Sequence, residues 1–324
     1  KSLKSAYKLV KKYHSFAPKA SLLVNGYHPL HKMFEDEIAT LNGFEEGLVV
    51  GSGFLANLAL IEALVRKEDE LFIDSEYHAS GILASKLVER VRTFKHNCAE
   101  DLEEKLKKSQ AKRKIIAIEG VYSMSGDIAA RELFELVNQY NVLLIVDEAH
   151  SSGTLGEKLL GIFDYYNLPI LPNYIKMGTL GKAYGSYGAY ILCDSTIKDF
   201  LINRGKPIIY STAPSVFDIA LALVNLRYIQ KKGIILHKKV QKRKKIIEKV
   251  LGIKRESLIV PISQPSNKRA KELQFSLHKK GFLVGAIRQP TVAEPIIRLI
   301  PRLGVKRSRL KEALELLKWS NGRN

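Results

Sequence analysis

Several short apolar runs of this chain are each followed at once by side chains able to do chemistry or hold a ligand. After the runs at 48–50, 71–73, 115–118, 142–146 and 175–177 come Ser52, Gly53 and Phe54; His78; Glu119 and Ser123; Asp147 and His150; and Thr179 and Lys182. Taken singly, each has an ordinary reading: Asp147 as a helix cap, Lys182 as a surface lysine, His78 as a structural histidine. Together they offer an amine, a carboxylate, an imidazole and a glycine turn that leads into a helix.

This combination fits the chemistry of pyridoxal 5'-phosphate. That cofactor needs a lysine to hold its aldehyde as an imine, and a carboxylate facing the pyridine nitrogen, because the protonated ring accepts electrons. It also needs a flat group against the ring and a helix N-terminus for the phosphate. Lys182, Asp147 and His78 match the first three needs, and Ser52–Phe54 matches the fourth. We therefore predict a pyridoxal phosphate site.

Elements that bring these residues together are predicted from the apolar pattern. Seven strands are expected at Leu48–Val50, Leu71–Ile73, Val91–Phe94, Ile115–Ile118, Val142–Val146, Ile175–Met177 and Ala189–Leu192, with helical patterns such as Asn57–Leu64, Asp101–Lys107 and Arg131–Tyr140 between them. Apolar strands alternating with helices indicate an α/β fold with a mainly parallel seven-stranded sheet. Ligands bind outside the carboxyl ends of such strands, where the reactive residues lie.

The chain changes character after about residue 211. Helical stretches at 215–230 and 238–251 precede short strands at 258–262, 282–286 and 296–300 and helices at 268–280 and 308–319. We predict an N-terminal arm (1–30), a large cofactor-binding domain (31–212) and a linking helix with a smaller α+β C-terminal domain (213–324).

Composition narrows the class of protein. The 324 residues carry 52 Lys+Arg against 33 Asp+Glu, a formal net charge of +19. That charge favours anionic partners, but no nucleic-acid motif accompanies it, so nucleic-acid binding is a minor alternative. No apolar run approaches the roughly 18 residues of a membrane helix. Cys98 and Cys193 are too few for a disulfide framework or a four-ligand zinc site. We expect a cytoplasmic protein without a metal.

Four segments carry a resemblance to a known family. Asp147–Gly153 (DEAHSSG) and Gly178–Ala183 (GTLGKA) resemble the DEAHS-x-G and lysine motifs of the α-oxoamine synthases. Glu119–Asp127 (EGVYSMSGD) and Ser52–Asn57 (SGFLAN) are similar to two further motifs of that family. The resemblance runs from about Asn25 to Leu317. It implies the fold type I aminotransferase-like architecture and a homodimer with shared active sites.

The resemblance also implies roles for individual residues. Lys182 would hold the cofactor and move the proton at the substrate α-carbon, Asp147 would pair with the ring nitrogen, His150 with the ring phenolic oxygen, and His78 would stack on the ring. The phosphate would be bound at Ser52, Gly53, Phe54 and Thr179, and by Thr212 of the neighbouring subunit. Ser123 and Glu119 would border the pocket, and Arg298 would bind the substrate carboxylate. An ordinary ion pair is the competing reading of Arg298.

Within the family, two stretches favour one branch. Ala286–Val292 (AIRQPTV) and Ile208–Thr212 (IIYST) are similar to segments of the branch that joins L-alanine to a pimeloyl thioester, on coenzyme A or an acyl carrier protein, in biotin biosynthesis. Glycine C-acetyltransferase is the alternative within the family. A catalytically inert partner subunit is an alternative of another class, although the retained lysine, aspartate and histidines argue against it.

The chain departs from the family pattern at three places, two of them near the N-terminus. The glycine-rich segment that normally precedes the NGYH sequence is here Pro18–Leu23 (PKASLL), and Ile300 stands where a second arginine is usual after Arg298. The usual N-terminal strand with its substrate-binding asparagine is also missing. Because the sequence has no initiator Met, we expect that it is truncated.

A basic surface at 231–249 would suit an acidic acyl carrier.

Overall fold

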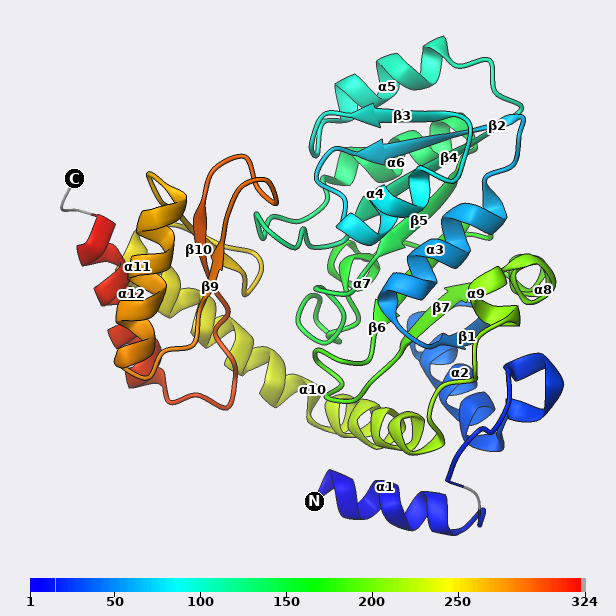
Figure 1. The fold of residues 1–324 in the computed structure, drawn as a ribbon, viewed down its shortest axis with the longest axis horizontal. Coiled ribbons are helices and arrows are strands. Elements are labelled where there is room, and N and C mark those ends of the chain that lie inside the picture. The colour runs from blue at the N-terminus through cyan, green and yellow to red at the C-terminus, as the bar shows by residue number, and fades with distance from the viewer. Residues whose placement is uncertain (15, 322–324) are drawn as a thin grey trace. The chain divides into compact units, whose positions relative to one another are not determined.

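The computed structural model describes residues 1–14 and 16–321 (Figure 1). The chain divides into two compact units. Unit 1 comprises residues 1–121 and 129–233, and unit 2 comprises residues 122–128 and the chain from Ile234 onward. The predicted boundary at residue 213 falls within the part of the chain that groups with unit 1.

Unit 1 is built on a seven-stranded sheet with the order β1-β7-β6-β5-β4-β2-β3. Its strands are β1 (Glu46–Val50), β2 (Asp69–Asp74), β3 (Val91–Phe94), β4 (Arg113–Glu119), β5 (Leu143–Asp147), β6 (Tyr174–Thr179) and β7 (Ala189–Cys193). All neighbours pair in parallel except β7, which is antiparallel to both β1 and β6. Each predicted strand is present, and the predicted α/β class with a mainly parallel sheet is confirmed.

Helices cover both faces of this sheet, as the continuous burial of the central strands requires (Figure 1). One face packs against α3 (Gly53–Leu64), α4 (Ala79–Ser85), α8 (Ser195–Arg204) and α9 (Lys206–Ile209), through buried side chains such as Leu60 on α3 and Ile145 on β5. The other face is rich in aromatic rings, for example Phe34 against Tyr190 at 6.2 Å. There lie α2 (Pro29–Asn42), α6 (Arg131–Tyr140) and α7 (Ile162–Tyr166). Helix α5 (Ala99–Lys108) follows β3.

The first thirty residues, expected to form an arm, group with unit 1. They hold helix α1 (Ser2–Lys11), whose Ala6 and Val10 are buried, and a single π-helical turn at Leu22–Gly26. Before that turn, the chain pairs with a distant segment: Ser21 forms a bridge with Thr212, and the Ala213 amide donates to the Ala20 carbonyl at 3.0 Å. The N-terminal segment therefore fixes the backbone around Thr212.

Unit 2 is a smaller α+β body. Its antiparallel sheet has the order β8-β10-β9, from β8 (Val260–Ser263), β9 (Gly285–Ile287) and β10 (Ile296–Leu299). Helices α11 (Asn267–Lys279) and α12 (Arg307–Asn321) and the C-terminal part of α10 (Val216–Leu251) share one apolar core with that sheet, in which Ile247, Leu277, Ile297 and Leu314 are buried.

The two helical stretches predicted at 215–230 and 238–251 form one continuous helix, α10, of 36 residues. Gly233 lies at the gap between the two predicted stretches, but an isolated glycine in a helix costs only about 1 kcal/mol relative to alanine. A side chain at this position would meet no atom within 4 Å, so nothing packs there to bend the helix.

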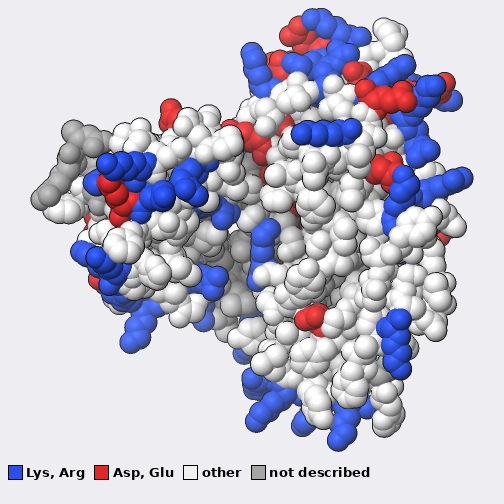
Figure 2. Space-filling model, viewed as in Figure 1, with Lys and Arg blue, Asp and Glu red and all other residues white. Residues whose placement is uncertain are grey.

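The surface carries its positive charge in a dispersed form. Figure 2 shows Lys and Arg spread across the visible face, with acidic residues interspersed among them. Among the described residues, no helix is long and apolar enough to cross a membrane.

Candidate active site

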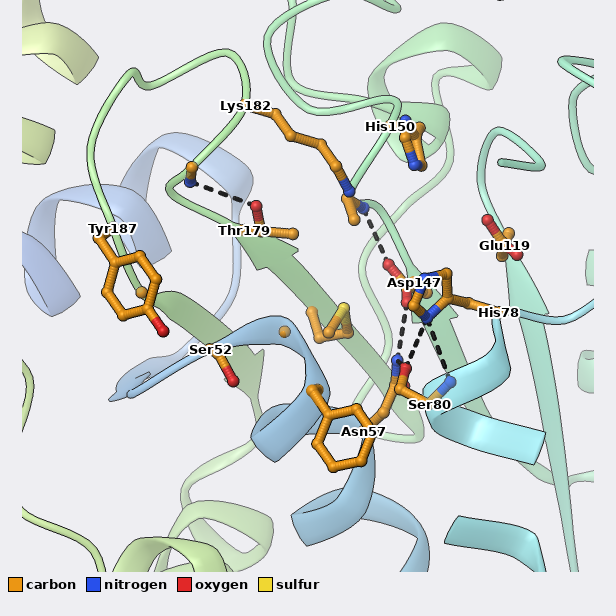
Figure 3. A pocket seen from close by; sticks show the side chains of 16 residues that line it. Ser52, Asn57, His78, Ser80, Glu119, Asp147, His150, Thr179, Lys182 and Tyr187 are labelled. Carbon is orange, nitrogen blue, oxygen red and sulfur yellow. Dashed lines mark hydrogen bonds between the residues drawn. The ribbon is translucent and has the colours of Figure 1, made fainter. Parts of the chain in front are cut away.

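Most of the predicted site residues of unit 1 converge on one cavity of about 220 Å³ at the carboxyl ends of the strands (Figure 3). Nine of them line it: Ser52, Gly53, Phe54, His78, Glu119, Asp147, His150, Thr179 and Lys182. They come from segments up to 130 positions apart in the chain, between Ser52 and Lys182. Their convergence follows from the topology, since neighbouring parallel strands end at the same edge of a sheet.

Lys182 lies on the connection between β6 and β7. Because these strands are antiparallel neighbours, the connection is a closed loop: the Leu180 amide donates to the Gly188 carbonyl at 2.9 Å, and the Ser186 amide to the Leu180 carbonyl at 2.8 Å. Gly188 has a φ of +116°, which disfavours any residue with a side chain. From this loop the Lys182 side chain extends into the cavity (Figure 3).

Asp147 ends strand β5 and is 3% exposed. Its Oδ1 accepts from the Ala149 amide at 2.9 Å, but a turn and not a helix follows β5, so the reading of Asp147 as a helix cap is wrong. Its Oδ2 accepts from Asn57 Nδ2 at 2.8 Å. Both donors are uncharged, so neither supplies a positive charge to the carboxylate. A protonated pyridine nitrogen would complement the negative charge of the carboxylate.

His78 precedes helix α4 and caps it, because its Nδ1 accepts from the Ser80 amide at 3.2 Å. The ring also lines the cavity. Burial lowers the pKa of His78; the Asp147 carboxylate opposes that shift and the Lys182 ammonium adds to it. The imidazole is therefore neutral at pH 7, as a flat group against an aromatic cofactor should be.

The glycine turn before α3 forms an anion site of the usual kind. Ser52 is the N-cap, with its Oγ accepting from the Leu55 amide at 3.2 Å, and the amides of Gly53 and Phe54 stand in the first turn, where no intrahelical acceptor exists. A Cβ at Gly53 would lie 3.3 Å from Cγ2 of Thr179. Glycine thus lets the helix N-terminus approach the end of β6.

Two further predicted residues border the cavity from neighbouring strands. Glu119 ends β4, is 1% exposed and lies opposite Asp147 in the strand register. His150 lies in the turn that follows β5, and its carbonyl accepts from Thr154 Oγ1 at 3.0 Å.

A buried ion pair between Glu148 and Lys176 stabilises the turn that carries His150. Glu148 and Lys176 are both almost fully buried, with 3.6 Å between Oε1 and Nζ. Glu148 also accepts from the Ile162 amide at 2.9 Å and from the Ser151 hydroxyl, and so holds both ends of the 148–162 segment. Lys176 Nζ donates to the Leu160 carbonyl and, at 2.8 Å, to Asn42 Oδ1.

Three predicted residues lie outside the cavity of unit 1. Ser123 and Arg298 belong to unit 2, where Arg298 occupies β10 between Pro261 and Gly285 of the adjacent strands. Thr212 is exposed at its bridge with Ser21. Their roles remain predictions.

The structure adds residues that sequence reasoning did not select. Asn57, Ser80 and Tyr187 also line the cavity. Asn57 was inside a quoted motif, and its position one helical turn after Gly53 was the available signal. Nothing in the sequence singled out Ser80 or Tyr187.

The donor set fits pyridoxal phosphate. The cavity offers an amine on Lys182, a buried carboxylate on Asp147, a neutral imidazole on His78, and a helix N-terminus whose close approach depends on Gly53. Lys182, Asp147 and the turn at Gly53 would hold the aldehyde, ring nitrogen and phosphate ends of the cofactor. Among the described residues, no cluster of three or more metal-ligating side chains accompanies them.

A family profile described as aminotransferase class I and II matches residues 9–317. The chain belongs to this family. Over 317 residues it is 44% identical to the 8-amino-7-oxononanoate synthase of Helicobacter pylori, which covers 97% of this chain and 84% of the relative. The enzyme of the same name from Dechloromonas aromatica is 35% identical over 291 residues, 86% of this chain and 75% of the relative.

Solved structures of the family agree with the fold. Serine palmitoyltransferase of Sphingomonas wittichii superposes with a TM-score of 0.92 at 23% identity, covering 99% of this chain and 83% of the other. The 8-amino-7-oxononanoate synthase of Francisella tularensis gives 0.82 at 26% identity, covering 98% and 92%. The predicted α-oxoamine synthase family, fold type I architecture and dependence on pyridoxal phosphate are thereby confirmed.

Proposed function

We propose that this protein is an acyltransferase that condenses L-alanine with a pimeloyl thioester to give 8-amino-7-oxononanoate, carbon dioxide and a free thiol. The 44% identity to the Helicobacter pylori enzyme of that name, spread over 97% of the chain, carries the proposal. The retained amine, carboxylate and imidazoles of the cavity support an active enzyme rather than an inert partner subunit.

Each of the predicted site residues has its own role in the proposed reaction. When bound, pyridoxal phosphate supplies an aldehyde for the amino group and a conjugated ring that accepts the electron pair released at the α-carbon. Asp147 holds the proton on the ring nitrogen, and Lys182 takes the proton from the α-carbon of alanine and later returns one. His78 would lie against the ring and orient it, and His150 would hydrogen-bond the phenolic oxygen of the ring. The Arg298 guanidinium is suited to bind the substrate carboxylate.

The acyl donor is an anionic thioester, on coenzyme A or on an acidic carrier protein. Four lysines of α10, Lys238, Lys242, Lys245 and Lys249, are exposed and spaced at i, i+4, i+7 and i+11, and therefore share one helix face. We call them the α10 lysine stripe. The exposed Ile234 and Ile235 precede it on the same helix. A basic stripe beside apolar side chains suits the docking of an acidic carrier protein.

A homodimer belongs to the proposal. Thr212 is exposed and its backbone is fixed by the bridge to Ser21, so it is available to reach the phosphate site of a second copy. Sedimentation at several protein concentrations tests this point. The two free cysteines, Cys98 and Cys193, are consistent with a cytoplasmic enzyme.

The test is reconstitution with pyridoxal phosphate, followed by visible spectra with L-alanine, glycine or L-serine and mass spectrometry of the product formed from pimeloyl-CoA. We expect the largest spectral response to alanine and the C9 amino ketone acid as product. Lys182→Ala should abolish turnover, whereas Lys67→Ala, at an exposed lysine of the same unit, should not. A preference for glycine would favour an acetyltransferase, and a protein that never binds the cofactor would refute the proposal.

A further inference from the structure

Asn57 lies one helical turn after Gly53 on α3 and is 1% exposed. Its Nδ2 donates to Asp147 Oδ2 at 2.8 Å (Figure 3) and to Ser80 Oγ at 2.9 Å, and its Oδ1 accepts from the Tyr77 hydroxyl at 2.7 Å. A side-chain amide has two N–H groups and one carbonyl. Asn57 therefore uses every polar atom it has.

The direction of the amide is fixed by its neighbours. An ionised carboxylate only accepts hydrogen bonds, so the nitrogen of Asn57 must face Asp147. The carbonyl then faces Tyr77, whose buried hydroxyl donates to it. Burial raises the pKa of Tyr77 well above its usual value, and the Asp147 and Glu119 carboxylates raise it further, so the phenol keeps the proton that it donates.

From Asn57 the chain of hydrogen bonds continues to His78. Because Ser80 Oγ accepts an N–H from Asn57, its own hydrogen is free to point at His78 Nδ1, 2.7 Å away. The same Nδ1 accepts from the Ser80 amide, which is always a donor. Nδ1 is thus unprotonated, and the neutral ring carries its hydrogen on Nε2.

We propose that Asn57 is a positioning residue that controls two walls of the cofactor cavity at once. Through one N–H it holds the carboxylate of Asp147, and through the other, by way of Ser80, it fixes His78 as the Nε2–H tautomer. The inference deepens the proposed function, on which the cofactor contacts of Asp147 and His78 rest. The hydrogen-bond chain itself does not depend on which substrate is used.

Nitrogen-15 NMR of histidine-labelled, cofactor-free protein tests the tautomer directly. The His78 signals are identified by their loss in His78→Gln. In the wild type we expect an unprotonated Nδ1 at pH 7. In Ser80→Ala we expect a mixture of tautomers and a His78 titration midpoint that rises by about half to one pH unit, because the neutral form loses one hydrogen bond. In Asn57→Ala the Ser80 hydroxyl remains but is no longer oriented by the amide, and we expect a smaller shift in the same direction.

Asn173→Ala is the matched control. It removes another side-chain amide of unit 1, which donates to the Val142 carbonyl at 2.8 Å away from the His78 chain, and should leave the His78 signals unchanged. A second readout is cofactor affinity, which we expect Asn57→Ala to weaken about five- to tenfold, corresponding to the loss of one hydrogen bond.

A protonated Nδ1 in the wild type, or unchanged His78 signals in both Asn57→Ala and Ser80→Ala, would overturn the proposal. If Asn57→Ala does not fold, Ser80→Ala decides the matter alone. Because the tautomer is measured without cofactor or substrate, failure of this inference is distinguishable from failure to form 8-amino-7-oxononanoate.

Discussion

His31 makes the stability of this protein depend on pH in a way that can be calculated. The ring is fully buried; its Nδ1 accepts from the His28 amide at 2.9 Å and its Nε2 donates to the Pro214 carbonyl at 2.8 Å. Burial lowers its pKa to about 4 from 6.5; the bond to Pro214 opposes this shift and nearby His28 adds to it. A proton on Nδ1 would also eliminate the bond from His28.

The direction and the size of this pH dependence follow from the difference in proton binding between the folded and the unfolded state. Above pH 6.5 His31 is neutral in both the folded and the unfolded state, so its titration does not lower the free energy of unfolding there. Between pH 6.5 and 4 the unfolded chain binds a proton that the folded protein does not, and the free energy of unfolding falls as the pH falls. A difference of about 2.5 pKa units corresponds to about 3 kcal/mol, a large share of the roughly 5–15 kcal/mol typical of a folded protein.

The assay is urea unfolding of the cofactor-free protein at pH 7, 5.5 and 4, at one fixed protein concentration. His31→Gln cannot titrate, so we expect its free energy of unfolding to lose about 3 kcal/mol less than that of the wild type between pH 7 and 4. His278→Gln, at an exposed histidine, should behave as the wild type. Equal pH dependence in His31→Gln and the wild type would refute the reasoning.

Three further predictions concern other parts of the molecule. Lys176→Met leaves Glu148 buried without its cation and should lower the free energy of unfolding by about 3–5 kcal/mol; Lys176→Met combined with Glu148→Gln should recover part of that loss, and a cost below about 1 kcal/mol would contradict the buried pair. Gly53→Ala places a methyl 3.3 Å from Thr179 Cγ2; we expect about tenfold weaker pyridoxal phosphate binding in a spectral titration, with little change in unfolding by urea. Reversing the charges of the α10 lysine stripe to glutamate should raise KM for a carrier-bound pimeloyl donor but not for pimeloyl-CoA, and an unchanged KM for the carrier-bound donor would exclude docking there.

The sheet and most of the cavity were predictable because most strands contain a short apolar run that is soon followed by residues able to bind a ligand. Asp147 ends β5 and Lys182 lies in the loop that follows β6, so the parallel pairing of these two strands was enough to bring them together. These short strands could be predicted from local sequence, because a strand buried on both faces is a continuous run of apolar residues.

What the sequence did not reveal depends on contacts between distant segments. Nothing local shows that Ser80 bonds to Asn57, or that Lys176, within an apolar strand, is buried against Glu148. Gly233 illustrates the opposite case: a residue that locally suggests an interruption sits inside α10 because the helix on either side is held by packing.

The closed loop between β6 and β7 determines how far the reactive amine can travel. With Leu180 bonded to both Gly188 and Ser186, the backbone under Lys182 stays in place, and the amine moves only by rotations of its own side chain. An amine displaced by a substrate thus stays in the cavity at a high effective concentration, and its return is an intramolecular event. The fixed loop that places Lys182 in the cavity therefore also limits how long the cavity stays without the lysine amine.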